Sequence, residues 1–236
     1  MLFSKIQLSL YLNKSVEKID KKYYSVLGWI LDAIDNDQQI YQNTLSISPL
    51  INLENNQFKT FVSLSSEKST KDFINKITQK KQINLDKLYF DIQAIQLIKT
   101  FDPLNFQPKS DYKKVLFTFQ SPTCFSTPQW KPYIDIQPFP IFKSINKKLL
   151  KLWIDLKLDL LQIEKNIRLI WVKNLNTEKA QIKSGFKVGF YWKLFYEVKG
   201  DDLFKKQIHF LVESAEFTGV GLNPRLGMWN VYWKVF

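Results

Sequence analysis

Residues 216–231 read EFTGVGLNPRLGMWNV and hold three of the seven glycines in the chain, Gly219, Gly221 and Gly227. Glycine permits positive φ and lets a backbone come close to a partner. Successive backbone N–H groups in such a loop form a concavity that can hold an anion such as phosphate. Arg225 lies inside the stretch and adds a planar charge suited to phosphate. The stretch therefore predicts an anion-binding turn between an amphipathic helix and a last strand.

A plain helix end followed by a tight turn is the alternative interpretation of the same glycines. The stretch follows a predicted helix rather than a strand, and it lacks the Gly-Lys-Ser/Thr triplet and the following helix of known nucleotide-binding loops. These features exclude a P-loop and a dinucleotide fingerprint, so the rest of the chain has to decide between the two interpretations.

The composition indicates a folded protein with a polyanionic partner. The chain has 236 residues, of which 45% are hydrophobic and 15% aromatic, which is enough for one large or two small domains with a real core. Its formal net charge is +12, and most of this charge lies in the second half of the chain. A strongly basic balance favours a polyanion as partner without identifying it.

The chain has one cysteine, Cys124, and one histidine, His209. An internal disulfide and a metal cluster built from cysteines or histidines are therefore excluded, and no metal or other cofactor is expected. We expect Cys124 to be buried and inert and His209, in the middle of a predicted helix, to be structural. The sequence shows no secretion signal and no run of 18 apolar residues, so we expect a cytoplasmic protein with no membrane partner.

The first 100 residues predict the order β-α-β-β-α-β. Alternating apolar residues indicate strands, and apolar spacings of three and four indicate helices. Ser69 is the predicted N-cap of the second helix. The predicted strands are 3–12, 44–51, 57–65 and 86–100, the predicted helices are 21–35 and 70–80, and residues 35–39 form a polar loop.

A proline-marked connection after Asp102 divides the chain, and we predict domains at 1–106 and 111–236. The second half repeats the order β-α-β-β-α-β of the ferredoxin-like unit. Its predicted strands are 113–119, 167–172, 180–200 and 228–236, and its predicted helices are 141–165 and 201–215. The predicted fold is α+β, with two tandem ferredoxin-like domains and a C-terminal glycine-rich loop. RNA-recognition modules bind through the open sheet face of such a unit.

Short sequence motifs are spread over nearly the whole chain. They are LGWILDAI (27–34) with LSISPL (45–50), FTFQSPTCF (117–125), PFPIFKSI (138–145), SGFKVG (184–189), and AEFTGVG (215–221) with LGM (226–228). In the expected order, they resemble motifs of the CRISPR repeat-processing endoribonuclease (Cas six) family of the RAMP superfamily. Each stretch is short, and their combination and order make the resemblance specific.

The resemblance implies metal-independent cleavage within a repeat RNA. The 2′-OH upstream of the scissile bond attacks the phosphate and gives a 2′,3′-cyclic phosphate and a 5′-OH. The implied partners are CRISPR repeat RNA, the matured CRISPR RNA retained as product, and other Cas proteins of an effector complex. Such a reaction needs proton-transfer groups and positive charge near the phosphate.

Two departures from the family pattern concern the site. Trp229 stands where the family has its last glycine, and the loop 35–43, where the family often has a catalytic histidine, contains none. Tyr41 is then the candidate acid or orienting group, with Tyr24 and a lysine beside it. Tyrosine, with a pKa of about 10, is a poorer base than histidine but can donate a proton. Ordinary packing of each tyrosine stays open as the alternative.

The candidate RNA-binding residues are the three glycines and the basic residues of the second half: Gly219, Gly221, Arg225, Gly227, Lys187, Lys193, Lys147, Lys148 and Lys151. For each lysine, a solvated face is the alternative. Aromatic residues of the strand 180–200, namely Trp192, Phe195 and Tyr196, can stack on bases or belong to the core.

Two other functions stay open from the sequence. A protein of the same fold that binds the repeat without cutting it is consistent with the missing histidine. An unrelated basic RNA-binding or ribosome-associated protein with tandem ferredoxin-like units is consistent with the charge and the element order.

Overall fold

The computed structural model describes most of the chain, and the chain folds as two compact units. The first unit comprises the described residues of 1–105 and 181–185, and the second those of 106–180, 186–221 and 231–236. We describe each unit by itself. The described residues are 1–13, 30, 34, 37–48, 50–85, 88–119, 121, 123–126, 132–182, 185–221 and 231–236.

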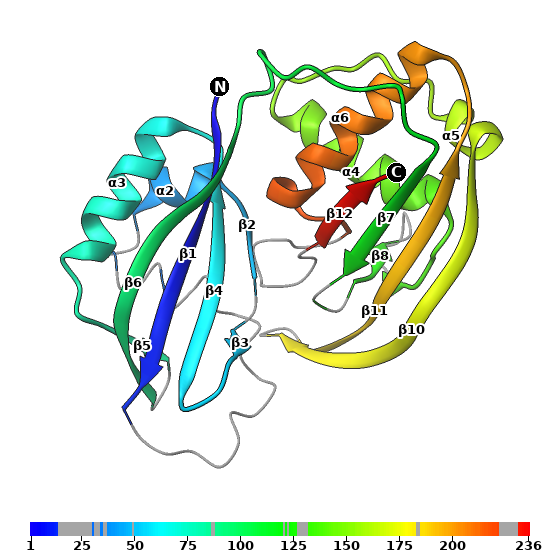
Figure 1. The fold of residues 1–236 in the computed structure, drawn as a ribbon. Coiled ribbons are helices and arrows are strands. Elements are labelled where there is room, and N and C mark those ends of the chain that lie inside the picture. Colours follow the sequence, from blue (N-terminus) through cyan, green and yellow to red (C-terminus); the bar gives the residue numbers. More distant parts are fainter. Residues whose placement is uncertain are drawn as a thin grey trace. The chain divides into compact units, whose positions relative to one another are not determined.

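The first unit is an antiparallel sheet with helices on one face (Figure 1). Its strands are β1 (Phe3–Leu12), β2 (Thr44–Ile47), β3 (Ile51–Asn52), β4 (Gln57–Leu64), β5 (Gln82–Leu85) and β6 (Leu88–Phe101). Its helices include α2 (Gln38–Asn43) and α3 (Glu67–Thr78). The strand order is β2-β4-β1-β6-β5, with β3 paired to β4.

The alternation predicted for 3–12 is confirmed by β1. Ile6, Leu8, Leu10 and Leu12 are buried in one cluster with Phe73 and Ile77 of α3. The residues between them point to the opposite face of the sheet, because successive side chains of a strand alternate between the two faces. The sequence therefore determines which face of the central strand forms the core.

The strand predicted for 86–100 forms as β6, and its pairing with β1 is irregular. The pairing of β1 with β6 shifts twice, between Lys5 and Ile6 and between Ser9 and Leu10. Ser9 pairs with Ala94 while Leu10 pairs with Ile92, so an extra residue lies between them on β6. Such β-bulges reverse the side-chain alternation and increase the local twist.

Three predictions for the first unit need correction. Residues 37–43 are not all loop, because α2 forms there with Asp37 as its N-cap. The sequence does not reveal this helix, because it has six residues and only Ile40 is buried, so it shows no apolar periodicity. The second helix begins at Glu67, since Ser66 and not Ser69 accepts the capping hydrogen bond. Strand β5 was not predicted. The predicted helix 21–35 lies mostly outside the described residues.

The second unit has a sheet with the same permutation of strands as the first (Figure 1). Its strand order is β10-β11-β7-β12. In this order β7, β10, β11 and β12 take the places that β1, β2, β4 and β6 have in the first unit. The α+β fold class of tandem ferredoxin-like units is confirmed. The elements are β7 (Lys114–Phe119), β8 (Phe125–Ser126), β9 (Pro132–Tyr133), α4 (Pro138–Lys151), α5 (Leu161–Asn166), β10 (Ile167–Ile182), β11 (Gly185–Val198), α6 (Asp202–Thr218) and β12 (Val231–Val235).

Helices α4 and α6 cover one face of this sheet. The ring of Phe142 on α4 lies 5.7 Å from the ring of Phe117 on β7, and Tyr196 of β11 packs against both. The Tyr196 hydroxyl donates a 2.6 Å hydrogen bond to the carbonyl oxygen of Ile136. Trp192 is buried on the same strand. Trp192 and Tyr196 are therefore core residues, and Phe195 lies on the other face.

The predicted helix 141–165 is wrong, because α4 ends at Lys151 and a separate α5 follows. At the end of α4, the backbone N–H of Ile154 bonds to the oxygen of Leu149, and that of Trp153 bonds to the oxygen of Leu150. These two bonds form a Schellman motif, in which the residue after the cap usually is glycine with positive φ. Here that residue is Trp153, with φ 62° and 95% of its surface exposed.

Two strand boundaries in the second unit also need correction. The predicted strands 167–172 and 180–200 are two long neighbours, β10 and β11, in which β10 continues to Ile182. Cys124 is buried, as expected. Within the described part of the chain, no helix is long and apolar enough to cross a membrane.

Candidate nucleic-acid interface

The glycine turn after α6 is described as far as Gly221. Helix α6 ends at Thr218, and Gly219 (φ 66°) and Gly221 (φ 85°) both adopt positive φ, which favours glycine. The N–H of Gly219 closes the helix by bonding to the oxygen of Ala215 at 2.9 Å. The predicted residues Arg225 and Gly227, like Trp229, lie outside the described residues.

Two side chains of α4 hold this turn by its backbone. The Lys148 ammonium donates to the carbonyl oxygens of Thr218, at 3.2 Å, and Gly219, at 2.8 Å. The Ser144 hydroxyl oxygen accepts from the N–H of Gly221 at 2.8 Å. Ser144 and Lys148 are four residues apart and so lie on the same face of the helix. We call this pair the α4 brace.

The electrostatics of the α4 brace come from the end of a helix. The last carbonyl groups of α6 carry the negative end of its dipole, which a cation stabilises. Burial lowers the pKa of Lys148 to about 7, and the charge of Lys151 acts in the same direction. The half-buried Lys148 side chain therefore contacts the turn through the carbonyl groups that it binds.

The other predicted lysines of the second unit differ from Lys148. Lys147 and Lys151 are exposed on the outer side of α4, and Lys193 is exposed on β11. Lys187 lies in β11, but its side chain is outside what the structure describes. The three exposed ammonium groups stand in solvent, where they can reach a phosphate.

The predicted catalytic residue Tyr41 belongs to the first unit. It lies in α2 and is 40% exposed. The cap of this helix is fixed by Asp37, whose carboxylate accepts from the N–H of Ile40 at 2.9 Å and from the Lys76 ammonium at 2.6 Å. The Lys76 hydrogen bond lowers the pKa of Asp37. Lys76 is thus bonded to the N-cap residue of the helix that carries Tyr41. Tyr24 lies outside the described residues.

His209 is enclosed by aromatic rings. Its ring lies 5.2 Å from that of Phe106, 5.8 Å from Tyr112 and 5.5 Å from Trp233. Its Nδ1 accepts a 2.7 Å hydrogen bond from the backbone N–H of Lys109. Burial lowers the pKa of His209, with the charge of Lys109 contributing. This setting agrees with the structural role expected from the sequence.

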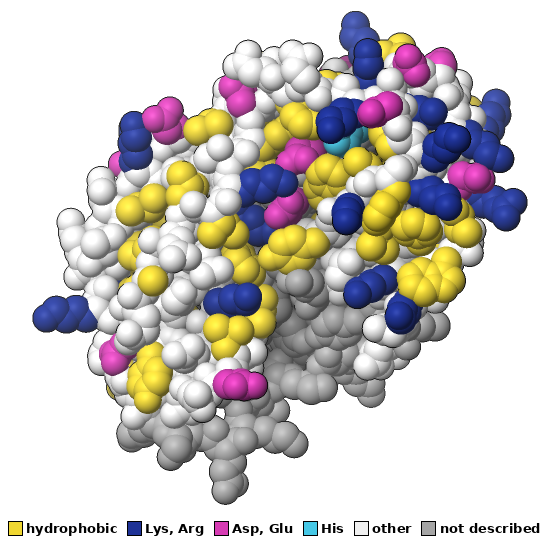
Figure 2. Space-filling model, in the orientation of Figure 1, with side chains coloured by type: hydrophobic (Ala, Val, Ile, Leu, Met, Phe, Trp, Pro, Cys, Tyr) yellow, Lys and Arg dark blue, Asp and Glu magenta, His cyan; other side chains and the backbone are white. Residues whose placement is uncertain are grey.

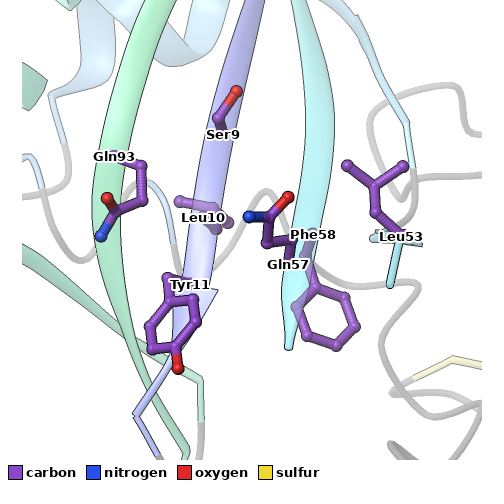
Figure 3. Close-up of a pocket in the computed structure, with 7 residues that line it drawn as sticks. All are labelled: Ser9, Leu10, Tyr11, Leu53, Gln57, Phe58 and Gln93. Atoms are coloured by element: carbon purple, nitrogen blue, oxygen red, sulfur yellow. The ribbon is translucent and has the colours of Figure 1, made fainter. Parts of the chain in front are cut away.

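A small hollow of about 270 Å³ lies on the sheet of the first unit (Figure 3). The side chains of Tyr11 on β1, Gln57 on β4 and Gln93 on β6 reach into it. None of the predicted site residues lines it. Within the described part of the chain, no group of three His, Cys, Asp or Glu side chains could hold a metal ion.

The α4 brace is the part of this region that the sequence reasoning missed. Its signal is present in the sequence, since Ser144 and Lys148 have helical i, i+4 spacing. That spacing became informative only when the structure placed the end of α6 against the same face of α4.

No protein-family model and no curated protein matches the chain. Solved structures match over nearly its whole length. A Cas6 product complex matches with a TM-score of 0.81 at 15% identity, covering 99% of each chain. A Thermus thermophilus Cas6 matches with a TM-score of 0.75 at 16% identity, covering 99% of this chain and 98% of the other. A Cas6-related protein from Pyrococcus furiosus matches with a TM-score of 0.71 at 15% identity and the same coverage. The chain has the fold of the Cas6 proteins.

Proposed function

We propose that the protein binds CRISPR repeat RNA and cleaves it as a processing endoribonuclease. The observation that carries the proposal is the likeness, over 99% of both chains and at a TM-score of 0.81, to a Cas6 protein in complex with its product. The sequence motifs point to the same family independently of the fold, because they were identified from residue types and their order.

The proposed reaction is metal-independent. The 2′-OH of the nucleotide before the scissile bond gives up its proton as its oxygen attacks the phosphorus, the bond to the 5′ oxygen breaks, and that oxygen takes up a proton. Tyr41 is the proposed donor or orienting group, with Tyr24 as a second candidate. A general acid in such a step contributes about 10² to 10⁴ in rate. The product carries a 2′,3′-cyclic phosphate and stays bound, for delivery to other Cas proteins.

The proposed RNA contacts lie in the second of two domains, which we assign to 1–106 and 111–236. The turn that contains Gly219, Gly221 and Gly227 lets its backbone approach a phosphate that Arg225 also contacts. The N–H groups of Gly219 and Gly221 themselves bond within the protein, to Ala215 and Ser144, and shape the turn. Further backbone contacts come from Lys147, Lys151, Lys187 and Lys193, whereas Lys148 acts by holding the turn in place.

The second candidate is a protein of the same fold that binds repeat RNA without cutting it. The observation that favours it is the lack of histidine in residues 35–43. Tyrosine has a pKa of about 10 and is a weak base at neutral pH. A binding protein of this kind would make every RNA contact proposed above but would not cleave the RNA.

A cleavage assay in EDTA tests both. The protein is incubated with an end-labelled repeat RNA and, in parallel, with a shuffled RNA of the same composition. One discrete product that ends in a cyclic phosphate supports the nuclease. Tight binding of the repeat with no product supports the binding protein. Equal affinity for repeat and shuffled RNA contradicts both and leaves a general basic RNA-binding protein.

A further inference from the structure

The sheet of the second unit has one face that its helices leave to solvent. Phe142 of α4 contacts Phe117, and His209 of α6 contacts Trp233, so both helices lie on the face of Phe117 and Trp233. The strand register places the alternate residues on the opposite face, because Phe195 and Lys234 both pair with Leu116. We call this opposite face the outer face. Its residues on β7, β11, β12 and the chain end are Lys114, Leu116, Thr118, Lys193, Phe195, Glu197, Tyr232, Lys234 and Phe236.

Aromatic rings and ammonium groups alternate on the outer face. The Lys114 ammonium lies 5.7 Å from the centre of the Phe195 ring, and the Lys234 ammonium lies 5.1 Å from that of Phe236. The two rings contact each other edge to face, with centroids 5.6 Å apart. Apolar and basic side chains lie interleaved on the part of the surface formed by this sheet, at the right of Figure 2.

The charge of the outer face favours a polyanion. Among the described residues of this face on β7, β11 and β12, three exposed lysines, Lys114, Lys193 and Lys234, stand beside one carboxylate, that of Glu197. Glu197 forms an ion pair with Lys199 at 3.4 Å, which offsets its charge. Phe236 is 51% exposed and Phe195 is half-buried, so at least one ring is open to a planar ligand.

We propose that the outer face binds a single-stranded segment of RNA, an inference that rests on the proposed function and adds a second contact surface to it. Bases stack on Phe195 and Phe236, and the phosphates between them contact Lys114, Lys193 and Lys234. Proteins that bind single strands combine aromatic platforms with a basic track in this way. Each pair of a ring and a neighbouring ammonium group can bind one nucleotide, because the ring stacks on the base and the ammonium contacts the phosphate. The surrounding ammonium groups argue against an apolar protein partner.

The test uses an unstructured probe, a fluorescent dodecamer of uridine, and measures its dissociation constant at several salt concentrations. Replacing Phe195 and Phe236 by leucine keeps apolar volume and removes the stacking surface. We expect the double variant to bind about thirtyfold more weakly, because two stacked bases are lost. Replacing Lys114, Lys193 and Lys234 by alanine should reduce the salt slope by roughly 2, at about 0.7 for each lost phosphate contact.

Matched controls lie off the outer face. Trp153→Leu removes a ring that is more exposed than either phenylalanine, and Lys206→Ala removes an exposed charge on α6. Both controls should bind the dodecamer like the wild type. If thermal unfolding shows that the double leucine variant is not folded, the single variant Phe236→Leu replaces it in the test. Phe236 is exposed at the end of β12, so this change does not disturb the core.

Wild-type affinity in the leucine variant, or an equal loss in Trp153→Leu, overturns the proposal. The proposed function fails separately: a protein that binds the dodecamer through the outer face but shows equal affinity for repeat and shuffled RNA refutes repeat recognition and leaves this surface in place.

Discussion

The Lys148 ammonium lies 2.8 Å from the carbonyl oxygen of Gly219, and this bond joins α4 to the glycine turn. The residue was expected to bind RNA phosphate directly. Its ammonium donates to the backbone of the turn, and we propose that any effect of Lys148 on RNA binding runs through the shape of that turn. The distinction can be measured, because a phosphate contact and a positioning contact respond differently to salt.

At pH 6, where Lys148 with its pKa of about 7 is charged, Lys148→Met should weaken the binding of repeat RNA about tenfold, since hydrogen bonds from a charged group contribute roughly 1.5–3 kcal/mol. The salt slope of binding should stay at the wild-type value, because no phosphate contact is lost. Lys147→Met, one residue away and exposed, is the matched control and should lower the slope by about 0.7–0.9. Equal slopes for the two variants would show that Lys148 contacts phosphate after all.

Arg225→Ala should weaken repeat binding and lower the salt slope by about 1, because the proposed loop and the arginine share a phosphate. The measurement is the same titration at several salt concentrations. Arg168→Ala, at the other arginine of the chain, is the control. An unchanged affinity together with an unchanged slope in Arg225→Ala removes the residue from the interface.

Tyr41→Phe should slow single-turnover cleavage of repeat RNA by about a hundredfold or more while leaving affinity unchanged, since only the hydroxyl is lost. Tyr11→Phe removes a hydroxyl of similar exposure from β1 of the same unit and should cleave normally. A wild-type rate in Tyr41→Phe would exclude it from the reaction and turn attention to Tyr24.

His209 should make the protein sensitive to acid. Its pKa in the folded state is lowered below the ordinary 6.5 by burial. As pH falls through about 6.5, the unfolded chain takes up a proton that the folded protein resists, so the free energy of unfolding falls, by at most about 1.4 kcal/mol per pH unit. His209→Gln should have a shallower slope between pH 6.5 and 5 in urea unfolding. A parallel slope would mean that other groups cause the acid sensitivity.

Trp153→Gly should raise the free energy of unfolding by about 1 kcal/mol, because glycine adopts the positive φ at the end of α4 without the steric cost of a side chain. Trp153→Ala loses the same ring but keeps a Cβ, so the difference between the two variants isolates the backbone contribution. Urea unfolding measures both. Equal stability of the alanine and glycine variants would contradict a strained backbone at this position.

The element order of the fold could be predicted because strong periodicity marks the long elements. The alternation in 3–12 and the helical spacing in 201–215 both led to the elements that form there. Short elements with one buried residue, such as α2, lack such a signal. The end of α4 was missed because Trp153 continues the apolar spacing of the helix while its backbone has already left it.

For the candidate site as well, some features could be predicted from the sequence and others could not. Glycines in a turn and lysines on a surface are visible in the sequence, and Gly219 and Gly221 do adopt the positive φ that glycine permits. The direction of a lysine is not visible. Lys147 and Lys148 are identical neighbours, yet one is exposed and the other donates to the end of α6, 70 residues further along the chain.

The sequence by itself determined the long strands and helices that carry a strong periodicity, the tandem repetition of a similar element order and the position of the glycine turn, because these depend on residue type and local spacing. Only the tertiary structure decided that Lys148 holds the turn and that Phe195, rather than Trp192 or Tyr196, lies on the outer face. The alternation of β11 separates these residues into two faces. Which face becomes core depends on where α4 and α6 pack, and those helices come from distant parts of the chain.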